Sequence, residues 1–204
     1  MFYVSRQQMQ EWKQVVAVIS VIVLLASTVL YLVMFGPVLD DPEFDAALVW
    51  AEQVGMPDLE LTREYPFSPI TREDAVDRYI VTAQEMEMIV YGDNLCDFDD
   101  IDALEQHTKD QIILACRYRF FLGNEGSFVP EWYLTKAGSL VALVRGMYPA
   151  RAFVEIDPYR QPFVTTAHEL WITKRPSSPY MMYLVKKYEL LLQLYRAAHL
   201  KNPF

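Results

Sequence analysis

The apolar and polar positions divide the chain into one long uninterrupted apolar stretch and a series of short amphipathic ones. Residues 15–35, VVAVISVIVLLASTVLYLVMF, contain no charged residue. A helix rises about 1.5 Å per residue, so a helix over this stretch is about 31 Å long and matches the hydrocarbon core of a bilayer. We therefore predict a single transmembrane helix over residues 15–35.

The charges on either side of the apolar stretch predict its orientation. Arg6 and Lys13 precede it, whereas Asp40 and Asp41 follow it. Basic residues concentrate on the cytoplasmic side of a span. We expect residues 1–14 to be a short cytoplasmic tail and 40–204 to form an extracytoplasmic domain held at the cell membrane. A cleavable signal peptide is the alternative, but its apolar region is shorter, about 7 to 15 residues, and ends in a small-x-small site that is absent here.

Beyond residue 40 the apolar residues recur at spacings of three and four, which is typical of amphipathic helices. The sequence Asp41-Pro42-Glu43 predicts the start of a first helix that ends near residue 54. An irregular stretch with three prolines follows. A second helix is expected to open at Thr71, whose hydroxyl can cap the amides near Asp74.

The same order of helix, loop and helix recurs twice. We predict a helix over about 103–121 and another that Thr135 caps, then a helix with Phe163 and Trp171 and a last, long helix that bears Leu184 and Tyr195. No segment has the pattern of a strand. Because a lone helix pair cannot bury its apolar face, we expect three helix-loop-helix units in one all-α domain, over approximately 42–90, 96–149 and 153–200.

The charge distribution limits the function classes. The net charge is −9, with 20 acidic and four basic residues between 40 and 110 and six acidic and twelve basic residues from 111 on. Nucleic-acid binding is disfavoured, because it needs a basic face with clustered phosphate contacts. The two oppositely charged halves either attract each other within the fold or meet an external partner.

The residues that could carry chemistry are sparse. Three widely separated histidines and two cysteines are too few for a zinc site, and no nucleophile, base and orienting group occur together. We therefore expect no enzymatic activity, metal or cofactor. The acidic run 97–102 lacks the glycine and the glutamate of an EF-hand and is interpreted as helix-capping residues. Cys96 and Cys116 either form a bridge or leave an ordinary buried thiol.

The second unit contains a series of residues that is found in S-layer homology repeats. They are Phe98, Gly123, Gly126, Phe128, Pro130, Leu134, Thr135 and Lys136. The first unit has the second half of the same motif, in FSPITREDAVDRYI, with Thr71 and Arg72 in place. The third unit keeps Phe153 and Asp157 but reads SSPYMM where the motif is expected. Residues 43–198 thus resemble a membrane-anchored S-layer homology domain with divergent repeats.

The resemblance implies a pseudo-threefold helical domain with grooves that bind anionic cell-wall polysaccharide. The candidate ligand-binding residues are Thr71, Arg72, Thr135, Lys136, Gly123 and Gly126. A guanidinium beside a helix N-terminus can form two hydrogen bonds to one carboxylate, so Arg72 is the strongest candidate. Lys136 lacks the planar fork and is expected to bind more weakly, although its half of the domain is less acidic.

Two alternatives stay open at the level of sequence. Glu73, Asp74 and Asp77 can engage Arg72 in internal ion pairs. The aromatic residues Trp50, Trp132 and Trp171 can stack on sugars, but core filling is the commoner use. The expected function is non-catalytic attachment of the cell membrane to cell-wall polysaccharide or S-layer components. A structural subunit that binds protein partners in a membrane-anchored complex is the alternative.

Overall fold

The computed structural model describes residues 19–23, 25, 27, 41–92, 96–123, 126–148, 161–173 and 183–200. The chain divides into two compact units, Met1–Pro42 and Glu43–Phe204. In the first unit, residues 19–23, 25 and 27 are helical and exposed. The rest of the predicted span 15–35 lies outside the described residues. Among those that are described, no helix combines the length and the apolar character needed to cross a bilayer.

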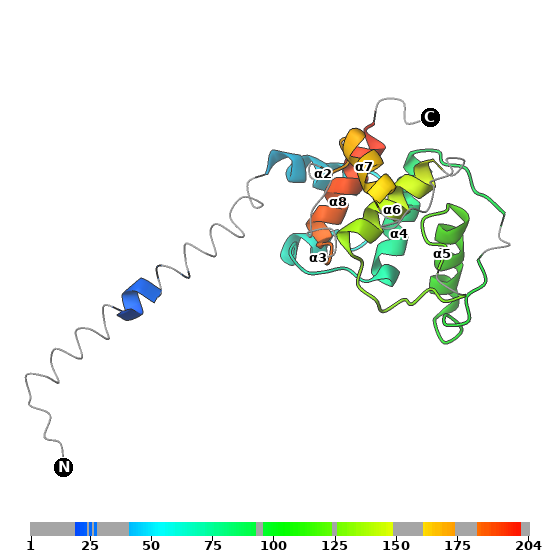
Figure 1. Ribbon diagram of the computed structural model, residues 1–204, viewed down its shortest axis with the longest axis horizontal. Helices are drawn as coiled ribbons and strands as arrows, with labels where there is room; N and C mark the ends of the chain where they lie inside the picture. The colour runs from blue at the N-terminus through cyan, green and yellow to red at the C-terminus, as the bar shows by residue number, and fades with distance from the viewer. Residues whose placement is uncertain are drawn as a thin grey trace, which may run out of the picture. The chain divides into compact units, whose positions relative to one another are not determined.

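The described part of Glu43–Phe204 is built from helices, which confirms the all-α prediction (Figure 1). The described ranges contain no strand. In chain order the helices are α2 (Pro42–Gln53), α3 (Leu59–Glu64), α4 (Arg72–Glu85), α5 (Gln106–Arg117), α6 (Lys136–Met147), α7 (Gln161–Glu169) and α8 (Lys187–Ala198).

Two helix starts lie where the sequence predicts them. The Asp74 N–H donates to Oγ1 of Thr71 at 3.1 Å, and the Gly138 N–H donates to Oγ1 of Thr135 at 3.0 Å. Each threonine has an extended backbone and satisfies an amide of the first helical turn, which is the property that makes threonine a good N-cap. Both capping predictions are confirmed.

Other helix bounds differ from the prediction. α3 interrupts the stretch expected to be irregular, and α5 ends at Arg117 because Arg119 has a left-handed backbone with φ of 69°. Leu184 precedes α8 instead of belonging to it. Trp171, predicted to lie in the helix that contains Phe163, follows α7 with φ of 60° and is 78% exposed. At Trp171 and Leu184 the apolar spacing continues beyond the residues that are helical.

The core lies where α4, α6 and α8 meet. α4 packs against α5 and α8, and α6 packs against α7 and α8. A buried polar chain joins the three central helices: the Tyr79 hydroxyl donates to the Ser139 carbonyl at 2.8 Å, and the Ser139 hydroxyl donates to Oε1 of Gln193 at 2.8 Å. Because each of these groups has a partner, their burial costs little free energy. These two hydrogen bonds also fix how the three helices are rotated relative to one another.

The three short segments that precede the central helices are joined to one another in a closed cycle. We call residues 68–71, 132–135 and 183–186 together the junction. Its isolated antiparallel bridges pair Thr71 with Tyr133, Thr135 with Leu184, and Lys186 with Pro69. Each bridge therefore joins the N-cap of one helix to the residue two positions before the N-cap of the next, and the third segment returns to the first.

Backbone hydrogen bonds repeat the same cycle. The first helical N–H of each central helix donates to a carbonyl three residues before the next N-cap: Arg72 to Trp132 at 2.8 Å, Lys136 to Tyr183 at 2.9 Å, and Lys187 to Ser68 at 3.0 Å. Alternation along the segments places Ile70, Leu134 and Val185 on the core side, where each is at most 5% exposed. One apolar residue per segment thus anchors the junction to the core.

The start of the domain is fixed to its last helix. Nε and Nη2 of Arg196 donate to the two carboxylate oxygens of Glu43 at 2.5 and 2.8 Å, and Nη1 donates to the Ile172 carbonyl at 3.2 Å. The Trp50 ring meets the Tyr195 ring edge-on with centroids 5.9 Å apart. A bidentate arginine–carboxylate pair that is partly buried is among the stronger ion pairs. α2 is therefore held along α8.

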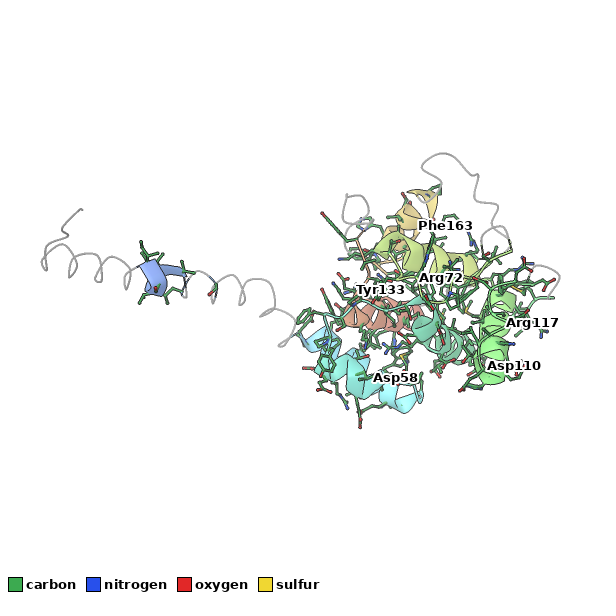
Figure 2. All side chains as sticks on the ribbon, turned by 90° about the horizontal axis from the view of Figure 1, so that it is seen from below. Asp58, Arg72, Asp110, Arg117, Tyr133 and Phe163 are labelled. Carbon is green, nitrogen blue, oxygen red and sulfur yellow. A yellow bond between two sulfur atoms is a disulfide. The ribbon has the colours of Figure 1, made fainter. Side chains whose placement is uncertain are left out.

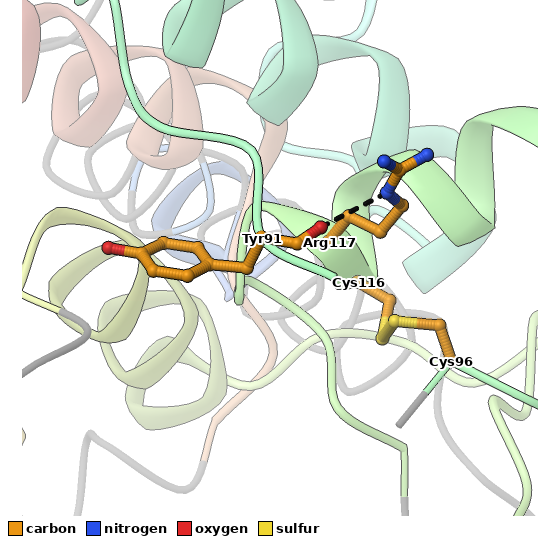
Figure 3. The surroundings of a disulfide bond; sticks show 4 residues. All are labelled: Tyr91, Cys96, Cys116 and Arg117. Carbon is orange, nitrogen blue, oxygen red and sulfur yellow. Dashed lines mark hydrogen bonds between the residues drawn. A yellow bond between two sulfur atoms is a disulfide. The ribbon is translucent and has the colours of Figure 1, made fainter. Parts of the chain in front are cut away.

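Cys96 and Cys116 form a disulfide, with Cα atoms 5.8 Å apart (Figure 3). The bridge ties the segment that follows α4 to the end of α5. Beside it, the Arg117 Nε donates to the Tyr91 carbonyl at 3.2 Å, and the Tyr91 N–H donates to the Arg117 carbonyl at 2.9 Å. Closing a loop of this length stabilises a fold by about 3 kcal/mol.

Two glycines of α6 give a matched test of how tightly the core is packed. A Cβ at Gly146 would lie 2.3 Å from Cε1 of Phe120, whereas a Cβ at Gly138 would lie 3.1 Å from Oγ1 of Thr135. We expect Gly146→Ala to lower the free energy of unfolding by about 1 to 3 kcal/mol through overpacking. Gly138→Ala, which adds the same methyl group to the same helix, should change it by less than about 1 kcal/mol. Denaturant unfolding of both variants measures the difference, and equal effects would contradict this packing.

Candidate functional site

The two motif threonines and the backbone amides beside them are used inside the fold. The Arg72 and Glu73 amides donate to the Trp132 and Pro130 carbonyls at 2.8 and 3.1 Å, and the Asp74 amide donates to Thr71. All three amides at the start of α4 therefore have protein acceptors. At the start of α6, the Lys136 and Gly138 amides likewise have acceptors. The geometry gives the helix amides a structural role and leaves ligand binding to the side chains.

Gly123 and Gly126 shape the loop that leads to the second junction segment. Both have left-handed backbones, with φ of 73° and 85°, which favour glycine. A Cβ at Gly123 would lie 2.5 Å from the Phe98 ring and 2.8 Å from the Ser127 carbonyl. The Asp99 N–H donates to the Gly126 carbonyl at 3.0 Å. These contacts account for both glycines as turn residues.

Lys136 is engaged by a carboxylate from the third unit. Its Nζ forms an ion pair with Oε1 of Glu189, and both side chains are mostly buried. The other carboxylate oxygen, Oε2, accepts from the Lys186 backbone N–H at 3.0 Å at the start of α8. Glu189 thus joins α6 to α8, and an anionic ligand would have to displace it to reach Lys136.

Arg72 has a different environment. Its guanidinium carbon lies 4.7 Å from the centroid of the Phe128 ring and 5.6 Å from that of Phe121. Its Nε is buried and has no hydrogen-bond acceptor within the described ranges. Burial lowers the pKa of the guanidinium, and the charge of Asp100 opposes this effect. The Arg72 guanidinium therefore makes cation–π contacts with two aromatic rings.

The alternative in which neighbouring acids neutralise Arg72 is not what the described residues show. Glu73, Asp74 and Asp77 follow Arg72 on α4, but no carboxylate of the described part of the chain forms an ion pair with it. The guanidinium lies instead over the ring of Phe128, which belongs to the second helix-loop-helix repeat. Arg72 and Tyr133 are both labelled in Figure 2, and the backbone of Tyr133 pairs with that of Thr71, the residue before Arg72.

Asp100 positions the loop under Arg72. Its Oδ1 and Oδ2 accept from the Phe128 and Val129 amides at 2.8 and 2.6 Å. Desolvation acts to raise the pKa of its carboxyl, but these two hydrogen bonds, one from its own amide and the charge of Arg72 outweigh it and hold the pKa below the usual value. The interpretation of residues 97–102 as helix caps is therefore wrong for Asp100, and the residue before α5, Glu105, makes no side-chain cap.

A second polar feature was not predicted from the sequence. Residues of α4 and α5 and the N-cap of α3 line a cavity of about 130 Å³, namely Asp58, Glu73, Asp74, Val76, Asp77, His107, Thr108 and Gln111. Burial raises the pKa of Asp77, which the charge of His107 partly offsets. Within the described ranges no three histidine, cysteine or acidic side chains are placed to hold a metal ion.

Buried Arg78 lies close to this acidic group. It is 1% exposed, and its Nη2 donates to the Asp58 carbonyl at 3.4 Å. Burial lowers its pKa, and the charges of Asp58 and Asp74 oppose this shift. Its polar position on α4 interrupts the apolar face, and the sequence alone gave no sign that it would be buried. The acids around it offset part of the cost of burying this charge, while its Nε and Nη1 have no hydrogen-bond partner within the described residues.

The tryptophans divide between core and surface. Trp50 is buried, as core filling predicts, whereas Trp132 and Trp171 are exposed. Of these, Trp132 belongs to the junction and contributes the carbonyl that accepts from Arg72. Trp132 is therefore the tryptophan that lies beside the candidate residues.

The Asp100 hydrogen bonds predict a pH-dependent contribution to stability. Because the folded pKa is depressed, this contribution is present above the unfolded value of about 3.9 and is lost as the pH falls through the folded pKa. We expect Asp100→Asn to lower the free energy of unfolding at pH 7 by about 1 kcal/mol or less, since solvent screens the exposed carboxylate. Thermal unfolding as a function of pH should show the two proteins converging in acid. A difference that persists undiminished at low pH would contradict the role of the charged carboxylate.

Comparison of the chain with family models, with curated proteins and with solved structures finds no match.

Proposed function

We propose that this chain is a non-catalytic attachment protein of the cell envelope. A single membrane span over residues 15–35 anchors it with the N-terminus in the cytoplasm, and an S-layer-homology-like domain outside binds anionic cell-wall polysaccharide or S-layer components. The observation that carries the proposal is Arg72, a partly buried guanidinium on two phenyl rings with no ion-pair partner in the described part of the chain.

The cyclic junction supports the relation to S-layer homology repeats. Three segments at corresponding places before α4, α6 and α8 make corresponding bridges and hydrogen bonds. The third unit, in which the motif residues are lost, makes the same backbone contacts as the first two, which supports a common origin of the three repeats. The pseudo-threefold arrangement that the resemblance implies has the same cyclic order.

The surroundings of Arg72 suit an acidic sugar. Burial reduces competition from water, so a ligand carboxylate would gain more from the guanidinium than at an open surface. Phe128 and Phe121 limit the directions in which the planar group can turn. Since the amides of α4 are already bonded, the carboxylate would be held by the Nη atoms of Arg72.

The disulfide supports a location outside the cytoplasm. Disulfides persist in oxidising compartments and are rare in the reducing cytosol. The Cys96–Cys116 bridge lies in the domain that the distribution of basic residues also assigns to the outside.

A second candidate function is a structural subunit that binds protein partners. It is favoured by the Lys136–Glu189 ion pair, which removes one of the two motif cations from the surface. In that case the domain keeps the architecture of a polysaccharide-binding protein while a different surface makes the contact.

Binding to purified cell walls distinguishes the two candidates. The full chain in detergent micelles is sedimented with walls that carry their polysaccharide and with walls stripped of it. Loss of a charge-assisted contact of about 1.5 to 3 kcal/mol should weaken binding roughly 10- to 100-fold in Arg72→Ala. The affinity of Arg72→Lys should lie between those of the wild type and Arg72→Ala, because lysine keeps the charge but cannot make a planar bidentate contact.

The controls separate site effects from general ones. Lys136→Ala should have a small effect on binding, because Glu189 already neutralises that lysine. Arg63, an exposed arginine paired with Glu52, gives a matched control in Arg63→Ala. Thermal unfolding of each variant shows whether it is folded. Equal binding of wild type and Arg72→Ala, or equal binding to stripped walls, would refute polysaccharide recognition at this site and favour a protein partner.

A further inference from the structure

The loop that supports Arg72 contains a residue whose backbone conformation its own side chain disfavours. Val129 has a left-handed backbone with φ of 54°. For a β-branched residue this region is a steric outlier, and a following proline, here Pro130, itself favours an extended predecessor. Such residues persist where surrounding contacts hold them, often beside a functional site. The loop is therefore strained at Val129, and other groups must keep it in place.

Asp100 supplies the contacts that hold this loop. Its two carboxylate oxygens accept from the Phe128 and Val129 amides at 2.8 and 2.6 Å. On the other side of the strained residue, the Pro130 carbonyl accepts from the Glu73 N–H at 3.1 Å. The loop is thus fixed from one end by Asp100 and from the other by the first turn of α4.

The strained residue directly follows the ring on which the Arg72 guanidinium lies. Phe128 is fully buried, and the centroid of its ring is 4.7 Å from the guanidinium carbon. Phe98, two residues before Asp100, packs against this ring with centroids 5.7 Å apart, and Phe121 meets it edge-on at 5.9 Å. Because the hydrogen bonds of Asp100 fix the backbone of Phe128, they also fix the position of its ring against Arg72.

Acidic groups beside the start of α4 compete for the same guanidinium. Glu131 precedes Trp132, whose carbonyl accepts from the Arg72 N–H at 2.8 Å, so this acid and Arg72 are neighbours across the junction. Burial raises the pKa of the Glu73 carboxyl, and the charges of Asp74 and Glu131 raise it further. A cation close to these carboxylates would offset their repulsion. A guanidinium that left its aromatic ring would therefore gain an ion pair there.

We propose that Asp100 is a positioning residue: it holds the strained loop at Val129 and thereby keeps the Arg72 guanidinium on its aromatic ring. Held there, the guanidinium does not pair with Glu73 or Glu131 and keeps its capacity to bind an external carboxylate. The consequence for ligand binding rests on the proposed function, whereas the position of the guanidinium does not.

Sedimentation with cell walls tests the consequence for binding. Asp100→Asn keeps the shape of the side chain but replaces one acceptor oxygen with an NH₂ group, which cannot accept from an amide. The full chain in detergent micelles is mixed with walls that carry their polysaccharide, and stripped walls give the background. We expect Asp100→Asn to bind roughly 5- to 10-fold more weakly than the wild type, because the strained loop relaxes when a hydrogen bond that holds it is lost.

Val129→Gly tests whether the strain is the cause. Glycine adopts a positive φ without steric cost, so the loop can keep its conformation with fewer hydrogen bonds from Asp100. We expect the effect of Asp100→Asn on binding to fall to about 2-fold or less when both compared proteins carry Val129→Gly. An effect as large as in the wild-type background would overturn the inference.

Two NMR measurements report the position of the guanidinium without any ligand. The Phe128 ring shifts the resonance of the Arg72 Nε–H, and in Asp100→Asn this resonance should move toward that of an exposed arginine. The pKa of the Glu73 carboxyl, followed by carbon-13 titration, should fall in the same variant, because a nearby cation favours the charged form. A merely structural role of Asp100 would lower stability and move neither quantity.

Glu43→Gln is a matched control for the loss of stability. It makes the same change from acid to amide at a carboxylate that accepts two hydrogen bonds, in this case from Nε and Nη2 of Arg196 in the last turn of α8. This variant should bind the walls as the wild type does. Thermal unfolding of each variant verifies its fold.

The outcomes separate this inference from the proposed function. Failure of the wild type to bind polysaccharide-bearing walls refutes the proposed function, and the two NMR measurements then decide the role of Asp100. Binding of the wild type with an equal affinity of Asp100→Asn overturns the inference alone. An Arg72 resonance and a Glu73 pKa that are unchanged in Asp100→Asn overturn it as well.

Discussion

The exchange of backbone hydrogen bonds at the junction is the constraint on which the rest of the domain depends. A helix N-terminus leaves amides without an intrahelical partner, and a buried unpaired amide is costly. Here the first amide of each central helix is satisfied by the loop before the next one, so no unit can complete its own helix start. The three units therefore depend on one another in a cycle, with Lys187 and Tyr188 returning to Ser68 and Pro66.

This constraint changes the meaning of the repeated motif. Thr71 and Thr135 recur because an N-cap with an extended backbone is needed where two segments pair, whereas Gly123 and Gly126 occur only in the second repeat, where the loop turns sharply. The position after the threonine is less restricted. At Arg72 the side chain lies on aromatic rings, whereas at Lys136 it is neutralised by Glu189. Two residues at equivalent places in the motif thus have different surroundings, an aromatic ring in one case and a carboxylate in the other.

The sequence predicts the parts of this structure that depend on local interactions. The helical period of apolar residues identifies the all-α class, and the two threonine caps follow from residues three positions apart. The ends of α7 and the start of α8 could not be predicted from periodicity, because Trp171 and Leu184 continue the apolar spacing beyond the helix. At the candidate site, the bonds of Asp100 to Phe128 and Val129 join residues 28 and 29 positions apart, and the partner of Lys136 is 53 positions away. Such pairings are decided by tertiary packing, and a motif alone cannot distinguish an available cation from one that is already paired.

Amide hydrogen exchange of the full chain in micelles tests the cyclic dependence most directly. If the three units close on one another, the amides of Arg72, Lys136 and Lys187 should exchange only through a common opening, with equal free energies close to that of global unfolding. Denaturant should accelerate all three to the same extent. Exchange of Lys187 through a separate, low-energy opening while Arg72 and Lys136 stay protected would show that the third unit is not required for the other two, and would contradict the account.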